Sequence, residues 1–180
     1  MKTLSFTLLI SLLTSQVHAV FIPEASGVCH LGEALIVAGD EEPRALWVQE
    51  NGSQNFVKKS VLGPKWDDLE DLARVNEQHF LALTSHSRTK SGRRKPEREQ
   101  LMLMQKQGDQ LTTRFTWSLR DQMITVLRQR LGNDLDMRQV EESSPDQGGL
   151  NAEGMALVGG VLYIGLRSPL TAQGEAIILV

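Results

Sequence analysis

The chain alternates short hydrophobic runs with polar turn residues, and three of these stretches resemble one another. They span residues 25–39, 69–83 and 152–165. Each consists of a strand rich in small residues, a tight turn and a second, more hydrophobic strand. Because a unit that recurs along a chain is typical of repeat architectures, the pattern predicts a fold built from repeated β-hairpins.

The first unit continues beyond its opening hairpin. Two further strands are expected at residues 44–48 and 56–61, joined by Asn51-Gly52, a dipeptide that favours tight hairpin turns with positive φ. The equivalent positions Ser26 and Glu70 lie 44 residues apart. Four short strands in about 40–50 residues are typical of one propeller blade.

We therefore predict an all-β fold, a partial β-propeller with two four-stranded blades, most of a third and one inserted helix. The blades are expected at about residues 24–62, 68–117 and 151–180. The inserted helix is expected at 118–132, capped by Ser118 and stopped by Gly132-Asn133. One face of this helix is apolar and carries Leu119, Met123, Ile124, Leu127 and Leu131.

Nearly three blades are fewer than the four to eight with which propellers close. The pattern thus predicts either further C-terminal blades or self-association, because an open stack exposes unpaired strand edges. The alternative is a small β-sandwich whose hairpins only look alike.

The first 19 residues have the features of a signal peptide. Lys2 supplies a positive charge, an apolar run extends from Leu4 to Thr14, and Val17-His18-Ala19 has the small-x-small pattern of a cleavage site. We expect residues 20–180 to form the domain, which would be exported to the periplasm or secreted. No later segment is long and apolar enough to predict a transmembrane helix.

Composition narrows the class of protein only slightly. A hydrophobic content of 41% suits a packed core, and a formal net charge of −3 gives no general attraction to nucleic acid. Cys29 is the only cysteine, so an internal disulfide is excluded and a small buried side chain is expected.

Polar residues recur where each unit begins. Glu24, Asp68 and Asn151 precede the first strands, and Ser26, Glu70 and Glu153 share one equivalent position inside them. Because the innermost strands of a propeller start near one mouth of its channel, these side chains are expected to converge. Carboxylate and amide oxygens are suitable ligands for Ca²⁺. The candidate metal ligands are Glu24, Asp68, Glu70, Asn151 and Glu153. Alternatively, each polar residue caps a strand corner by accepting backbone N–H bonds.

A second group of candidates follows the second strand of the units. Arg167 could grip an anionic substrate, and His86 and Arg88 occupy the matching place in the second unit. These three residues are weak catalytic candidates, because neither a Gly-x-Ser-x-Gly elbow nor a His-Glu-x-x-His motif is present. His86 is alternatively a polar loop residue.

Residues 88–98 form a basic segment between two strands of one hairpin. It carries six cations and one acid, Glu97, and is either an anion-binding loop or a flexible solvated one. No aromatic residue lies between the cations, which argues against single-stranded nucleic acid as a partner.

Several motifs together suggest a family. They are Pro23-Glu24-Ala25-Ser26-Gly27, Gly39-Asp40-Glu41, Trp66-Asp67-Asp68-Leu69-Glu70, Ser85-His86-Ser87 and Gly149-Leu150-Asn151-Ala152-Glu153-Gly154. With these motifs, residues 21–180 resemble the N-terminal half of a bacterial propeller family of unknown function, which is similar to the esterase-like phytase propellers.

The resemblance implies phosphoester hydrolysis, often supported by Ca²⁺, as one hypothesis. The leading hypothesis is a non-catalytic module of the cell envelope that binds a metal, a small anionic ligand or an envelope partner, because no complete catalytic set is present. Fold likeness alone does not assign activity.

Overall fold

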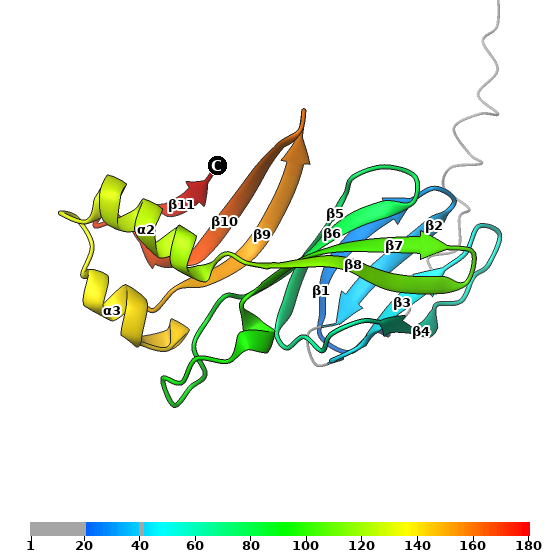
Figure 1. Cartoon of the computed structure of the whole chain (residues 1–180), viewed down its shortest axis with the longest axis horizontal. Helices are drawn as coiled ribbons and strands as arrows, with labels where there is room; N and C mark the ends of the chain where they lie inside the picture. Colours follow the sequence, from blue (N-terminus) through cyan, green and yellow to red (C-terminus); the bar gives the residue numbers. More distant parts are fainter. Residues whose placement is uncertain (1–20, 40–41) are drawn as a thin grey trace, which may run out of the picture.

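The computed structural model describes residues 21–39 and 42–180 (Figure 1). The predicted signal peptide, residues 1–19, therefore lies outside the described residues, as do Asp40 and Glu41. Within the described ranges, no helix is long and apolar enough to cross a membrane.

The fold is mostly β. The strands are β1 (Ala25–Leu31), β2 (Ala34–Gly39), β3 (Ala45–Gln49), β4 (Val57–Leu62), β5 (Leu69–Arg74), β6 (His79–Thr84), β7 (Gln100–Gln107), β8 (Gln110–Ser118), β9 (Asn151–Val158), β10 (Val161–Leu170) and β11 (Ala176–Leu179). The helices are η1 (Pro96–Arg98), α2 (Arg120–Leu131), α3 (Met137–Glu142) and η2 (Pro145–Gln147).

The strands form the three predicted units in chain order. Strands β1 to β4 and β5 to β8 are two antiparallel four-stranded meanders, and β9, β10 and β11 form a separate three-stranded sheet. This meander is the topology of a propeller blade. The structure thus confirms the predicted repeat of short antiparallel strands.

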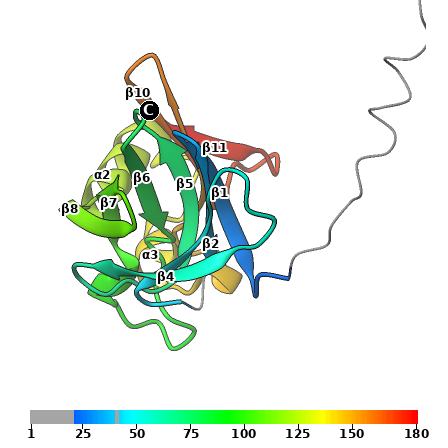
Figure 2. The same ribbon diagram turned by 90° about the vertical axis from the view of Figure 1, so that its right-hand side faces the viewer.

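The first two units are joined more closely than separate blades would be. Their outer strands β4 and β8 pair in parallel through Val61–Leu111 and Leu62–Thr112, which makes one eight-stranded sheet. Its two ends, β1 and β5, lie against each other, so the sheet curls into a nearly closed barrel (Figure 2). Gly27 allows this approach, because a Cβ atom there would lie 2.6 Å from the Cα atom of Asp71.

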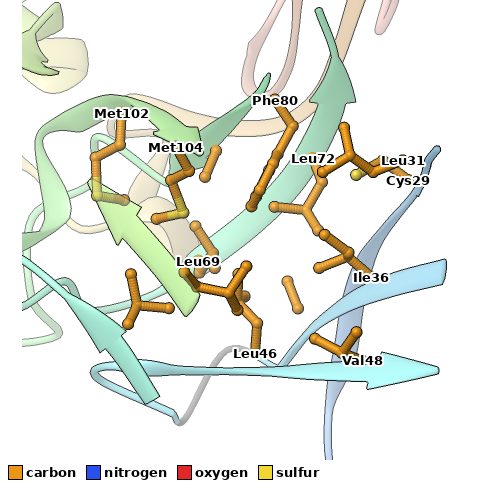
Figure 3. Close-up of a cluster of buried hydrophobic side chains, with 14 of the residues drawn as sticks. Cys29, Leu31, Ile36, Leu46, Val48, Leu69, Leu72, Phe80, Met102 and Met104 are labelled. Carbon is orange, nitrogen blue, oxygen red and sulfur yellow. The ribbon is translucent and has the colours of Figure 1, made fainter. Parts of the chain in front are cut away.

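The first hydrophobic core fills this barrel. Alternate residues of the strands point inward, as the pleat of a β-strand requires. Figure 3 shows Leu31, Ile36 and Leu46 of the first unit facing Phe80 and Met104 of the second. Cys29 is buried in the same core and forms no disulfide, as expected.

The second core lies between the second and third units and contains both longer helices. Leu83 of β6 packs with Met123 and Leu127 of α2, Val140 of α3 and Ile164 of β10. The apolar face predicted for the inserted helix is thus confirmed. This core fixes the third sheet beside the second unit.

Two local predictions were wrong in detail, and one helix was not predicted. Ser118 ends β8 and makes no cap, because α2 starts one residue later than that role requires. Helix α3 was not predicted; the side chain of Asp136 caps it by accepting hydrogen bonds from two backbone N–H groups. The connection between β3 and β4 is a longer loop in which Gly52 has a positive φ and Asn51 does not.

Candidate functional site

A β-bulge marks the same position in the innermost strand of all three units. In β1 the register passes from Ala25 to Gly27 and leaves Ser26 unpaired. In β5 the register passes from Leu69 to Asp71, so Glu70 is the extra residue of the bulge.

The third unit repeats this bulge. Gly154 pairs with Gly165 and Ala152 with Leu166, so Glu153 is the extra residue. A bulge bends its strand and turns the extra side chain away from the ladder. Ser26, Glu70 and Glu153 therefore occupy equivalent positions in the structure, as the repeat predicted.

The residue two positions before the bulge has the same unusual backbone conformation in the first and second units. Glu24 and Asp68 both have positive φ, 47° and 63°. Asn151 lies inside β9 without this conformation. A non-glycine residue in the left-handed region is unusual and marks a backbone that its surroundings hold in place.

A cleft of about 240 Å³ lies between the corners of the second and third units. Six of the eight candidate residues line it: Asp68, Glu70, Arg88, Asn151, Glu153 and Arg167. Lys90, Arg98 and Asp146 also line it, so four carboxylates and four cations share the cleft. Glu24 does not reach the cleft, because its corner belongs to the first unit.

Asp68 is held tightly on one wall. Its Oδ2 accepts hydrogen bonds from the Ser85 hydroxyl at 2.5 Å and the Ser87 hydroxyl at 3.2 Å. The Nη1 of Arg98 lies 3.0 Å from the same oxygen. This carboxylate therefore has three partners before any ligand arrives.

Glu153 and Arg167 form the opposite wall. The Nη1 of Arg167 donates to the Oε1 of Glu153 at 2.7 Å, and the Asn151 amide lies 3.4 Å from the same oxygen. The hydrogen bond from Arg167 to Glu153 raises the pKa of Arg167, and the charges of Asp146 and Glu70 act in the same direction. Arg167 is therefore protonated at neutral pH. Its side chain is largely exposed to solvent.

Arg88 differs from the other two arginines of the cleft. Its Nε donates to the backbone carbonyl of Glu141 at 2.5 Å and its Nη1 to that of Gly92 at 2.7 Å. Both partners are neutral, so its positive charge is oriented without being cancelled. Lys90, two residues on, is exposed at the same edge of the cleft.

The acids of the cleft do not form a preformed metal cage. Among residues 21–39 and 42–180, no group of three or more His, Cys, Asp or Glu side chains is placed to hold a metal ion. Asp68 and Glu153 are each paired with an arginine. The predicted Ca²⁺ site therefore stays a prediction.

His86 lies beneath the cleft and does not line it. Its side chain is fully buried, and its Nδ1 donates to the carbonyl oxygen of Thr84 at 2.7 Å. Burial lowers the pKa of His86 to about 4, so the imidazole is neutral at pH 7. This placement favours a structural role over that of a catalytic base.

The basic segment 88–98 is tied to the protein by ion pairs. Arg94 makes a bidentate contact with buried Glu99, at 2.8 and 2.5 Å. Lys95 lies 2.9 Å from Asp67, which also accepts a hydrogen bond from Arg98. The expectation of a flexible solvated loop is replaced by an ordered wall of the cleft.

Sequence reasoning missed one residue that organises this wall. Arg120, the first residue of α2, is buried and donates to the carbonyl oxygens of His86 and Glu141. Burial lowers the pKa of Arg120 to about 10. An arginine at a helix start carries no pattern that distinguishes it from a solvated one.

Comparison with known proteins assigns no family. No known family and no curated protein matches the chain. Among solved structures, the chain is weakly similar to the crystal structure of the N-terminal domain of Nup159, with a TM-score of 0.29 and 9% identity over 88% of this chain. The chain spans about half of that structure, 55%.

Proposed function

We propose that this chain is an exported β-propeller-like module that binds a small ligand carrying an anionic group. The module consists of two complete blades and most of a third. The observation that carries the proposal is the cleft between the second and third units, where Arg88, Lys90 and Arg167 face one space.

The charges in the cleft favour an anion at one end. Asp68 and Glu153 are engaged by Arg98 and Arg167, whereas Arg88 is held by neutral carbonyl groups. A guanidinium that is oriented but not neutralised forms strong hydrogen bonds with phosphate or carboxylate groups. The ligand's anionic group is therefore assigned to the Arg88 and Lys90 side.

Asp146 suits hydrogen-bond donors on the same ligand, because it lines the cleft and its carboxylate can accept from hydroxyl groups. The combination supports a small polyhydroxylated anion such as a sugar phosphate.

The test is isothermal titration calorimetry with inorganic phosphate and glucose 6-phosphate. We expect the sugar phosphate to bind more tightly, and Arg88→Gln to weaken its binding about tenfold, which equals about 1.4 kcal/mol. Arg130→Gln, on the exposed surface of α2, is the matched control and should leave binding unchanged. Equal affinities of Arg88→Gln and the unsubstituted chain would contradict the proposal.

A divalent-cation-dependent phosphoester hydrolase is the second candidate, supported by two carboxylates at bulges beside the same cations. Because His86 does not reach the cleft, Glu70 or Glu153 would have to serve as base or metal ligand. We expect Ca²⁺ to raise the melting temperature, and Glu70→Gln or Glu153→Gln to reduce that rise. An unchanged melting temperature together with no release of phosphate from a phosphomonoester excludes this candidate.

A further inference from the structure

A second cavity, of about 470 Å³, lies next to the cleft, between the region of α3 and η2 and the last residues of β10. Pro145, Asp146 and Arg167 line both spaces, so the two share one wall. Binding sites for small molecules usually measure about 300–1,000 Å³. The cleft, at about 240 Å³, is smaller than this range, whereas the second cavity falls within it. A ligand held in the cleft therefore has room to extend past Arg167.

Apolar side chains form much of the lining of the second cavity. Val140 of α3 and Pro169 of β10 line it and are buried, and Leu135 beside them is half-buried. Leu170 and Ala172 also line it but are exposed, which places them toward its solvent side. A surface of this kind binds a hydrocarbon group by removing it from water, and it offers a charged group little compensation for lost hydration.

The charges around the second cavity differ from those of the cleft. Asp134, Asp136 and Asp146 line it, and Arg167 is the one basic residue among the described residues that do so. Arg167 is already paired with Glu153. Because like charges repel, a second anionic group on the ligand would be disfavoured here. The second cavity therefore suits an uncharged, apolar part of a ligand whose anionic group stays in the cleft.

We propose that one ligand occupies both spaces: a sugar phosphate whose sugar carries an apolar substituent. The phosphate lies in the cleft, and the substituent lies in the second cavity. Asp146 and Arg167 border both spaces, so the sugar between them meets one hydrogen-bond acceptor and one donor for its hydroxyl groups. This inference rests on the proposed function, because the cleft must first hold the phosphate. It adds that the second cavity determines which sugar phosphate is preferred.

The test is isothermal titration calorimetry of the full chain with glucose 6-phosphate and with phenyl β-D-glucopyranoside 6-phosphate. We expect the phenyl compound to bind about tenfold more tightly, because its ring leaves water for the apolar lining of the second cavity. Equal affinities, or weaker binding of the phenyl compound, overturn this inference and leave the proposed function in place. If neither phosphate binds, both are wrong.

Two substitutions locate the phenyl group. Ala172→Trp places a bulky ring at the second cavity, and Leu170→Asn replaces an exposed part of its apolar lining. Each should bring the affinities for the two phosphates closer together. Gln173→Trp, in the same loop but outside the lining of this cavity, is the matched control and should keep the full difference. Circular dichroism checks that the variants are folded. A difference that persists in both Ala172→Trp and Leu170→Asn overturns the inference.

A third compound, phenyl β-D-glucopyranoside without phosphate, distinguishes one ligand across both spaces from two separate sites. It should bind much more weakly than its 6-phosphate. Arg88→Gln should weaken binding of the phenyl sugar phosphate about tenfold, as it does for glucose 6-phosphate. If the compound without phosphate binds as tightly as its 6-phosphate, or if Arg88→Gln leaves binding of the phenyl sugar phosphate unchanged, the second cavity is a separate site and the inference is wrong.

Discussion

His86 holds the backbone beneath the cleft in an uncommon conformation. Its φ is 55°, in the left-handed region, and its carbonyl accepts a hydrogen bond from buried Arg120. Its ring is buried and neutral. The neighbouring residues Ser85 and Ser87 both donate hydrogen bonds to Asp68. The backbone at His86 therefore positions the two serines that hold Asp68 in the cleft wall.

The buried imidazole predicts a pH dependence of stability. Burial lowers the pKa of His86 to about 4 in the folded protein, below the usual value of 6.5 for histidine. The unfolded chain therefore binds a proton that the folded protein does not, in the range between these values. The contribution is complete above about pH 6.5 and is lost as the pH falls toward 4, by about 3 kcal/mol in total.

The substitution His86→Asn removes this titration, and asparagine tolerates the left-handed backbone. Urea unfolding at pH 7 and pH 4.5 should show that the variant loses about 2 kcal/mol less than the unsubstituted chain. His30→Asn, at an exposed histidine of β1, is the control and should keep the full loss. Identical losses in all three proteins would show that His86 does not titrate as described.

Helix α3 is capped by a single side chain, that of Asp136. It has six residues, too few to be stable alone in water, and Asp136 binds the backbone N–H groups of Arg138 and Gln139. The carbonyl of Glu141 near its end binds both Arg88 and Arg120. The helix thus carries the acceptor that orients Arg88 toward the cleft.

Removal of the cap should destabilise α3. Asp136→Ala is expected to lower the free energy of unfolding by about 1 kcal/mol. Asp136→Asn is the matched control, since asparagine caps as well as aspartate. Hydrogen exchange of the α3 amides should accelerate in the alanine variant alone. Unchanged exchange would mean that tertiary packing, and not the cap, fixes the helix.

Elements with a strong periodic pattern of apolar side chains could be predicted from the sequence. The repeated hairpins and the apolar face of α2 follow from side-chain periodicity, and the structure confirms both. Helix α3 is too short to show a periodic pattern. The polar run around His86 gave no sign of burial, because the contacts that cover Ser85 and Ser87, among them their hydrogen bonds to Asp68, come from segments distant in the sequence.

Sequence reasoning predicted some contacts between distant segments and missed others. The pairing of β4 with β8 joins Val61 to Leu111 and depends on how two complete units meet. The convergence of Asp68, Glu70, Asn151 and Glu153 was predicted from repeat equivalence, and the structure places them around one cleft. The arginine partners of the acids were not predicted, because ion pairs depend on the fold of the segment 88–98.

The molecule as a whole places its cleft across the junction of two units. The second core joins these units, and two direct bonds cross the same junction: Ala152 N–H to the Ser85 carbonyl at 2.8 Å and Met155 N–H to the Asp71 carboxylate at 2.6 Å. These contacts hold the two walls of the cleft in a fixed position relative to each other.

A cavity in the second core should consequently weaken ligand binding from a distance. Leu127 is buried there and does not line the cleft, so Leu127→Ala is expected to cost about 2–5 kcal/mol of stability. Where the variant remains folded, its affinity for glucose 6-phosphate should fall about threefold or more.

Two controls accompany this prediction. Val126→Ala, at the exposed neighbour, should change neither stability nor affinity appreciably. Met104→Ala in the first core should destabilise the protein by a similar amount without weakening binding. Equal effects of the Leu127 and Met104 substitutions on affinity would show that the junction does not couple the core to the cleft.

The recurring bulge bears on how such a chain can diversify. Ser26, Glu70 and Glu153 lie outside the strand ladder and outside both cores. A change of residue at these positions therefore alters the chemistry at the start of a unit and leaves its strand register in place. Serine in one unit and glutamate in two others already occupy the same backbone. The chemistry at the start of each unit can therefore differ from that of the others without a change in strand pairing.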